Sequence, residues 1–390
     1  MTACGHCDSE IESKSDVCSE CGTPVLYQTN NGDPNRYREQ LLIERIADRA
    51  GVVALARWLP YEGIYPPYLL VGLSITLAFG ILPIVSIVTV GSSSAVSDPI
   101  TPVSIALGVI VGVVGVRYMA DGYVTAVNSL GLQDRPSPSN IDAFRGVVSF
   151  RTKLVLYVVG VLVYYLNLFL GPGIQTLIEV DGLIPTVIGQ FVLAPLVNLA
   201  LVVEFATMFF GIHFLLPRRL QNADLDLFFY DPRNMGGLSE IGQLLKRTYY
   251  VYTAGVLVYF IVAYGRIILS NLVNSPLPSP GLQVALFFSI AWGLGFVSIL
   301  YSMQQMHRIM SEKRERRVRE LETDIKDIIE NPYDIRSSRV ADQEAMETKE
   351  RQLEKVRSTR TYPTTFTMWS QIAVSVLLPQ ALQLVVQATL

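Results

Sequence analysis

The four cysteines of this chain all lie within its first 21 residues, as the pairs Cys4-x2-Cys7 and Cys18-x2-Cys21. Each pair can form a tight knuckle, and together they can present four thiolates to one tetrahedral Zn²⁺, as structural zinc sites do. The alternative is two disulfides, which require an oxidising compartment. We therefore predict a structural zinc ribbon over residues 1–27 that faces a reducing compartment.

Apolar segments dominate the rest of the chain, because half of all residues are hydrophobic and only 17% are charged. Seven stretches are long enough to supply the ~20 helical residues that cross a bilayer. They are Tyr68–Val90, Pro102–Tyr118, Leu154–Leu170, Ile184–Leu216, Tyr249–Leu269, Leu282–Met303 and Met368–Leu390. We expect an all-α polytopic protein of the cell membrane with about seven transmembrane helices, embedded in the lipid bilayer, whose first span is the insertion signal.

The basic residues predict an orientation, because Lys and Arg in short loops resist translocation. Of the 31 Lys and Arg, only Arg266 falls outside if the N-terminus is cytoplasmic, since the links 91–101, 171–183 and 270–281 contain none. Seven crossings then make the C-terminus extracellular. The net charge of −3 gives no support for a nucleic-acid partner. The excess of Arg over Lys, with abundant Val, is typical of a salt-adapted, archaeal-like or GC-rich source.

The segment before the first span, residues 28–64, is predicted to be a linker and an amphipathic helix. Apolar side chains recur at helical spacing over Asn35–Arg57, with arginines between them. Such a helix is expected to lie against the membrane surface. The six-helix transmembrane domain would then occupy residues 65–303.

Helical periodicity does not stop at the end of the sixth span. It continues to about Ile329, where Asn331-Pro332 ends it, and a second charged helix over Ala341–Arg357 returns toward the membrane. Residues 304–365 are therefore predicted to form a cytosolic helical stalk, followed by the seventh span at 366–390.

Glu204 is the outstanding candidate for chemistry inside the membrane. It falls near the middle of the fourth span, where an unpaired carboxylate costs ~2.5 kcal/mol or more. Asn198 lies nearby, beyond a proline that can open the helix, and Arg117 and His213 are candidate partners for the acid. Glu204 is either a transport or pore acid or a hydrogen-bonded group that only packs helices.

A loop before the fifth span carries Asp231 followed by Gly236-Gly237. The glycines permit a left-handed backbone, and the helix start that follows can hold an anion. Alternatively, the carboxylates of Asp224, Asp226, Asp231 and Glu240 hold a cation. Because Asp231 is followed by proline, we interpret the motif first as a structured turn.

The last span carries Gln380, Gln383 and Gln387 on one face of a helix whose other faces are apolar. A stripe of uncharged amides suits a water-filled pore formed by several subunits, and it equally suits hydrogen bonding between helices of one subunit. A third alternative is that the segment lies in the interface and does not cross.

The order of these parts resembles the seven-helix insect chemoreceptor and gustatory-receptor-like group. The resemblance covers about residues 65–390 and rests on architecture: an inner N-terminus, seven spans, a cytosolic extension of the sixth and a chain that ends with the seventh. It implies a homo-oligomer, a tetramer in that group, with Gln380, Gln383, Leu384 and Gln387 lining a ligand-gated cation pore and Gln304–Ile329 forming the anchor. The zinc ribbon is no part of that pattern.

No hydrolytic, redox or nucleotide-binding signature is present, so we do not expect an enzyme. The first hypothesis is an oligomeric ligand-gated ion channel or chemoreceptor-like receptor whose last helix lines a pore. Its alternatives are a membrane-anchored zinc-ribbon adaptor or sensor that recruits a cytosolic protein partner, and a transporter that uses Glu204.

Overall fold

The computed structural model describes residues 2–3, 10–11, 37–59, 64–97, 100–132, 141–171, 173–223, 225–273, 282–334 and 336–363. Within these ranges the chain is almost entirely helical, and its strands form two short antiparallel pairs. The four cysteines of the predicted zinc ribbon, Cys4, Cys7, Cys18 and Cys21, lie outside the described residues. So do Asp224 and the whole last span, with Gln380, Gln383, Leu384 and Gln387.

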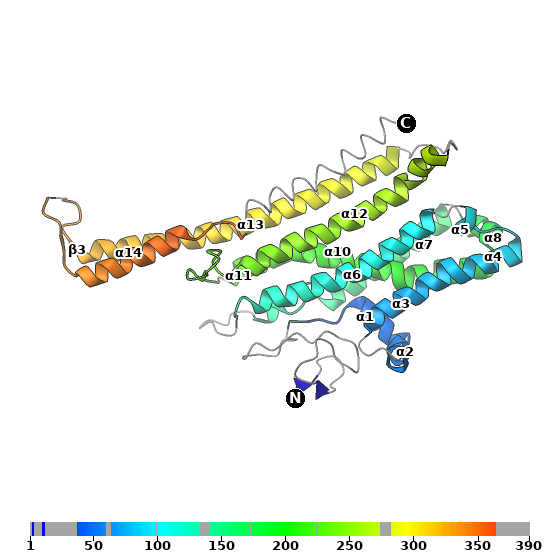
Figure 1. Ribbon diagram of the computed structural model, residues 1–390, viewed down its shortest axis with the longest axis horizontal. Helices are drawn as coiled ribbons and strands as arrows, with labels where there is room; N and C mark the ends of the chain where they lie inside the picture. The colour runs from blue at the N-terminus through cyan, green and yellow to red at the C-terminus, as the bar shows by residue number, and fades with distance from the viewer. Residues whose placement is uncertain are drawn as a thin grey trace.

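The elements follow one another in an order set by the apolar segments (Figure 1). Strand β1 (Thr2–Ala3) pairs with β2 (Glu10–Ile11). The helices are α1 (Leu42–Arg49), α2 (Val52–Trp58), α3 (Pro66–Ile75), α4 (Leu82–Val90), α5 (Ser94–Ser97), α6 (Ile100–Asn128), α7 (Phe150–Leu170), α8 (Ile174–Asp181), α9 (Leu183–Thr186), α10 (Ala200–Phe210), α11 (Leu216–Asn222), α12 (Ser239–Val273), α13 (Leu282–Ile328) and α14 (Gln343–Ser358). Three π-helical segments, Thr76–Ile81 (η1), Val187–Leu199 (η3) and Gly211–Leu215 (η4), join neighbouring helices, and Ile141–Phe144 (η2) is a 3₁₀ turn.

Five described helices are long and apolar enough to cross a membrane. They are Pro66–Val90, Pro102–Asn128, Phe150–Leu170, Leu183–Asn222 and Leu286–Ile328. The expected span Tyr249–Leu269 is also helical and forms the middle of α12, although α12 is not among these five. The predicted helical class with several membrane-length apolar helices is thereby confirmed.

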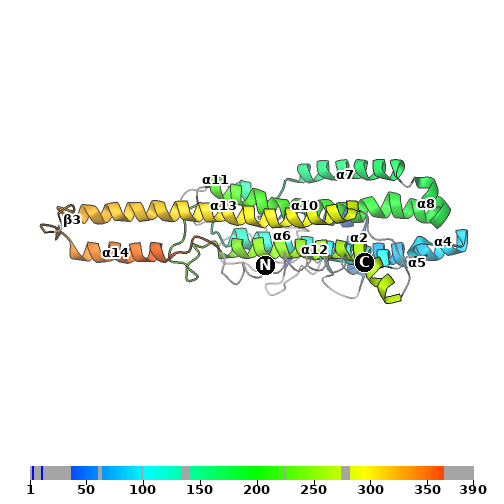
Figure 2. The same ribbon diagram turned by 90° about the horizontal axis from the view of Figure 1, so that it is seen from above.

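Apolar side chains on α7 point outward and contact little of the protein. Val155, Leu162, Val163, Leu166 and Phe169 are each about 60% exposed, and α7 lies at the edge of the layer of helices (Figure 2). A continuous exposed apolar face of this kind is unfavourable in water and favourable against lipid chains.

The centre of the bundle is held by α6 against α12. Glycines recur on the face of α6 that meets α12: a Cβ added at Gly115 would lie 2.4 Å from Val251, and one at Gly122 would lie 3.2 Å from Leu244. Small residues let two membrane helices approach closely, which strengthens dispersion contacts where no hydrophobic effect operates.

Helix α1 does not lie on the membrane surface as expected. Leu41, Ile43 and Ala47 are 2%, 0% and 0% exposed, and Leu41 and Ile43 belong to the main core together with side chains from α6 and α10. The single helix expected over Asn35–Arg57 is instead two short helices, α1 and α2, separated by Gly51 with φ of 73°. The apolar face of α1 packs against protein instead of lipid.

Helix α13 projects beyond the other helices, and α14 lies beside it in both views (Figure 1, Figure 2). Its 47 residues span about 70 Å, more than twice the ~30 Å of hydrocarbon. The helix ends at Ile328, one residue from the expected end. Strand β3 (Ile329–Glu330) pairs with β4 (Arg339–Val340), and α14 then returns along α13.

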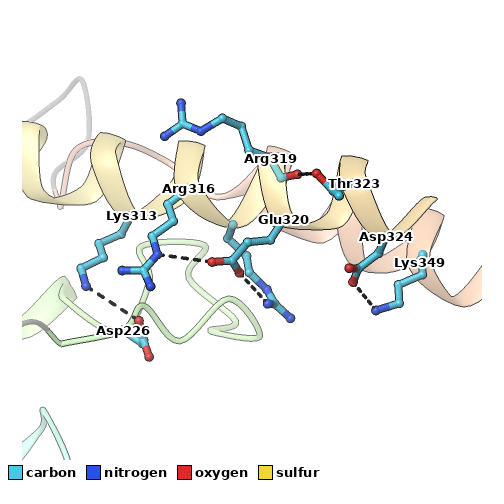
Figure 3. A network of polar contacts seen from close by, with 9 residues as sticks. Asp226, Lys313, Arg316, Arg319, Glu320, Thr323, Asp324 and Lys349 are labelled. Atoms are coloured by element: carbon cyan, nitrogen blue, oxygen red, sulfur yellow. Dashed lines mark hydrogen bonds and ion pairs between the residues drawn. The ribbon is translucent and has the colours of Figure 1, made fainter. Parts of the chain in front are cut away.

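Ion pairs between α13 and α14 hold this hairpin in register (Figure 3). Lys349 Nζ lies 2.6 Å from Asp324 Oδ2, and Arg357 lies 2.8 Å from Glu322. At the base of the hairpin, Lys313 lies 3.8 Å from Asp226 in the loop before α12. These pairs are largely exposed, so each contributes only about 0–1 kcal/mol and their main effect is on register.

The end of α14 is joined to the membrane domain through the loop 225–238. The Arg360 N–H donates to the Asn234 carbonyl at 2.8 Å, and Gly242 on α12 lies directly under Pro363. A Cβ added at Gly242 would lie 2.0 Å from the Pro363 carbonyl oxygen. The return segment therefore depends on the absence of a side chain at this position.

We predict that Gly242→Ala displaces the segment after α14, because the added methyl group overlaps a backbone atom. The expected results are faster tryptic cleavage after Arg360 and a loss of about 1–3 kcal/mol in unfolding free energy. Gly293→Ala is the matched control, since nothing lies within 4 Å of a Cβ there. Equal cleavage rates in the two variants would contradict this docking.

Candidate functional site

Two parts of the described structure gather polar groups among apolar helices, and the first is a buried ionic cluster around Glu204. Glu204 on α10 accepts a hydrogen bond from Lys153 Nζ at 2.6 Å. Its other carboxylate oxygen accepts from the Leu42 backbone N–H, at the start of α1, at 2.5 Å. The two charged side chains are only 2% and 0% exposed. One carboxylate therefore joins α1, α7 and α10.

The partners that the sequence suggested for Glu204 are wrong. Arg117 lies 3.7 Å from Asp121 and stacks over the Tyr65 ring at 4.4 Å. His213 Nδ1 instead lies 3.0 Å from the Ser302 hydroxyl. Lys153 was missed because a basic residue at the edge of an apolar span was interpreted only as a topology signal.

The depth of Glu204 also differs from expectation. The continuous helix Leu183–Asn222 has 40 residues, about 60 Å, so only half of it fits in a bilayer. Glu204 lies level with the first helical turn of α7, which Ser149 begins by accepting a hydrogen bond from the Thr152 N–H at 3.3 Å. The carboxylate therefore sits near one end of the spanning region instead of its middle.

A second buried acid, Glu44, fixes the other side of α1. It accepts from the Leu41 N–H at 2.8 Å, the Tyr65 hydroxyl at 2.6 Å and Arg38 at 3.0 Å. Burial and the Glu44 carboxylate raise the pKa of Tyr65 well above its usual value. Burial lowers the pKa of Arg38, but the nearby Glu44 and Asp121 carboxylates outweigh it and the net shift is upward. Tyr65 thus remains a donor and Arg38 remains a cation at any physiological pH.

This cluster is suited to holding segments together. Both Glu204 oxygens and both Glu44 oxygens have donors, and Glu204 has no exposed surface. An acid that carries a proton or an ion needs an oxygen that can reach water or substrate. The geometry fits the packing interpretation of Glu204 better than the transport interpretation.

The loop motif around Asp231 is also satisfied internally. Asp231 accepts from the backbone N–H groups of Arg233, Met235 and Gly237 at 2.9, 3.1 and 3.0 Å. Burial by itself raises the pKa of Asp231, but these donors outweigh it and the pKa is lowered. Gly236 and Gly237 have φ of 63° and 78°, the left-handed region that glycine tolerates. The turn interpretation of the motif agrees with this geometry.

Of the other acids proposed for a cation site at this loop, Glu240 and Asp226 form ion pairs, and Asp224 lies outside the described residues. Glu240 lies 2.8 Å from Arg233, and Asp226 lies near Lys313. Among the described residues, no group of three or more His, Cys, Asp or Glu side chains could hold a metal ion.

The second polar region is a cavity of about 740 Å³ between the helix Pro66–Val90, α6 and η3. Its apolar wall includes Ile75, Phe79 and Leu82 on the first span, with Ile105 and Val109 on α6. The cavity extends to Ser93, Ser94 and Asp181, at the end of the spans away from Glu204. Its volume falls within the roughly 300–1,000 Å³ of small-molecule sites.

The opposite wall carries a column of polar side chains on the helix that also holds Glu204. Thr186, Gln190 and Asn198 lie four and eight residues apart, and all three line the cavity. We call them the polar column. Gln190 is the acceptor of a hydrogen bond from the Tyr164 hydroxyl. Asn198, singled out from the sequence as a polar neighbour of a helix-breaking proline, therefore faces a cavity.

The wide turns of η3 make this wall. In a π-helix the hydrogen bonds reach one residue further than in an α-helix, and Pro195 removes one donor. Tyr157 and Tyr165 on α7 donate to the carbonyls of Pro195 and Phe191 at 3.2 and 3.3 Å. Carbonyls in this irregular segment are thereby satisfied without water.

The Thr186 hydroxyl has no partner within the described structure, although the residue is only 4% exposed. A buried hydroxyl without a hydrogen bond is unfavourable by about 1–3 kcal/mol. The hydroxyl oxygen is itself buried, so water or a bound molecule in the cavity would become its partner only after the side chain rotates about χ1.

No family model matches the sequence, and neither a curated protein nor a solved structure matches the chain significantly. Function must therefore be argued from the residues and their arrangement.

We predict that Lys153→Met loosens α1, because it leaves the Glu204 carboxylate buried without its counter-charge. The expected loss is about 3–5 kcal/mol of unfolding free energy, with faster amide hydrogen exchange over residues 42–49. Arg308→Met is the control: it breaks the Arg308–Glu312 pair, which is also short, at 2.8 Å, but 65% and 57% exposed. That change should stay within about 1 kcal/mol. Unchanged protection of α1 in Lys153→Met would show that the pair does not hold it.

Proposed function

We propose that this protein is a multi-pass integral membrane protein, with a cytoplasmic N-terminus, that acts as an oligomeric ligand-gated channel or chemoreceptor-like receptor. The observation that carries the proposal is the cavity at the outer end of the spans, with its polar column. A concave site that combines apolar walls and a few aligned polar groups is typical of small-molecule recognition. In this orientation it is reached from outside the cell.

The distribution of charge supports the orientation. A cluster of charged residues lies where the inner ends of α3, α6 and α7 meet α1. Its members are Arg38, Glu44, Arg117 and Lys153. The opposite ends form the cavity, and the described lining residues there include no Lys or Arg. This asymmetry is what the positive-inside rule expects of a bundle with the cluster in the cytoplasm.

The stalk supports a role in assembly. The hairpin of α13 and α14 extends beyond the membrane-length part of the bundle, and its base docks on the loop before α12. In the chemoreceptor-like interpretation, Gln304–Ile329 would anchor a tetramer and the amide stripe of Gln380, Gln383 and Gln387 would line its pore with Leu384. These roles are proposed by resemblance.

An adaptor is the second candidate, and one observation favours it. Helix α1 is clamped by Glu204 and Glu44, so a zinc ribbon formed by Cys4, Cys7, Cys18 and Cys21 with structural Zn²⁺ would be tethered close to the inner face. At that position the zinc ribbon would offer a binding surface to a cytosolic protein partner. A transporter that uses Glu204 is less favoured, because its cycle would have to break the bond to Lys153.

Gln383→Leu separates these proposals, because replacing an amide with an apolar side chain of similar size makes a pore lining harder to wet. We expect purified protein in planar bilayers to conduct as an oligomer, and the variant to lose roughly tenfold or more of its conductance. The matched control is Leu162→Met on the exposed face of α7, which should conduct like the parent chain. Oligomeric mass is measured on the same samples.

A silent monomer would contradict the channel proposal. In that case the paired substitution Cys4→Ser and Cys18→Ser should abolish capture of a defined cytosolic partner if the adaptor proposal is correct. In a channel, the same substitutions would reduce only folding or assembly.

A further inference from the structure

We propose that the outer cavity binds a neutral, elongated molecule that carries a hydroxyl or carbonyl group near each end. This inference rests on the proposed receptor function for its biological role, but the binding site itself stands on the geometry of the cavity. The ligand class follows from three features of the lining: its charge, the spacing of its polar groups and the unpartnered Thr186 hydroxyl.

The charge of the lining indicates a neutral ligand. Asp181 is the only ionisable acid among the described lining residues, and both its oxygens are engaged. It accepts from the Ser94 N–H and from the Ser94 hydroxyl, each at 2.8 Å. No Lys, Arg or His belongs to the described lining. An anion would find no counter-charge, and a cation would find only an acid that already has two donors.

The polar column sets the length of the ligand. Thr186 lies toward the outer end and Asn198 toward the inner end, so the two are separated by twelve residues, at most about 18 Å along the helix. Ala194 lies between them on the same wall. The wall opposite is apolar, from Ile75 to Leu82. A chain with a polar group near each end matches Thr186 and Asn198 with its ends and the apolar wall with its middle. Gln190, between them, already accepts a hydrogen bond from Tyr164.

The end groups should be able to hydrogen-bond without charge. Thr186 offers a hydroxyl that has no partner in the described structure, and it can donate or accept. Asn198 offers both an amide donor and a carbonyl acceptor. An alcohol or a ketone satisfies either group, and each hydrogen bond gained in a dry site is one that a hydrocarbon end cannot replace.

Three probes of equal chain length test this proposal: 1,12-dodecanediol, 1-dodecanol and dodecanedioate. Equilibrium binding is measured with labelled diol on full-length protein in nanodiscs. We expect the diol to bind about tenfold more tightly than dodecanol, because the second hydroxyl adds one hydrogen bond. The dianion should bind more weakly than either alcohol.

Variants on the polar column locate the site. Asn198→Leu should abolish the preference for diol over dodecanol, because it removes the inner partner. Thr186→Val preserves shape and should also abolish the preference, because the diol then keeps only its bond to Asn198, which a single hydroxyl of dodecanol can make as well. Ala194→Phe should reduce binding of both at least tenfold by filling the cavity. Leu196→Phe, on the lipid-facing side of the same segment and 43% exposed, is the matched control and should bind normally.

Equal affinity of diol and dodecanol in the parent protein would overturn the proposal, as would tight binding of the dianion. Normal binding in Ala194→Phe, equal to that of Leu196→Phe, would also overturn it, because that result indicates non-specific partition into lipid. Failure of the proposed function is distinguishable: a protein that binds the diol but does not conduct retains the site and loses the channel. A conducting oligomer that does not bind the diol would support the channel proposal and contradict the proposed ligand site.

Discussion

The carboxylate of Glu204, held between Lys153 and the backbone of Leu42, fixes the half of this molecule that contains α1, which the proposed orientation makes the inner half. In a site with almost no exposed surface, each charge must find its partner inside the protein. The partners come from segments 51 and 162 residues away in sequence. Helix α1 is thereby drawn into the core, and Glu44 completes its attachment through Tyr65 and Arg38. The N-terminal segment becomes a structural member of the bundle instead of a membrane-surface helix.

The outer half is built differently, and this contrast makes a site possible. No ion pair involves the described residues that line the cavity, and one of its walls contains thirteen residues of π-helix with an internal proline. Tyrosines on α7 bond the carbonyls of Pro195 and Phe191. The inner half can therefore stay rigid while the outer half keeps open space beside Thr186, Gln190 and Asn198. A ligand there would act on the same continuous helix that holds Glu204, which offers a physical route from the cavity to α1.

Much of this architecture could be predicted from local sequence patterns. Apolar runs of membrane length predicted the five membrane-length helices. Helix α13 ends within one residue of the position that Asn331-Pro332 indicated. The Asp231 turn followed from its Asp-Pro and Gly-Gly residues. By contrast, the Lys153–Glu204 pair and the burial of α1 depend on contacts between distant segments, for which a single sequence carries no periodic signal. The sequence indicated the cavity only through Asn198 near Pro195. The opposite wall is formed by an apolar span whose sequence pattern does not differ from that of the other spans.

The orientation of the bundle in the membrane underlies both the proposed function and the access of ligand to the cavity. It is tested most directly by cysteine labelling in intact cells, with Ser92→Cys beside the cavity and Ser337→Cys at the exposed turn between β3 and β4. A charged, membrane-impermeant maleimide should label Ser92→Cys in intact cells. It should label Ser337→Cys above the level of the parent chain only after permeabilisation. Labelling of Ser337→Cys in intact cells, with protection of Ser92→Cys, would place the cavity in the cytoplasm and contradict a receptor for external molecules.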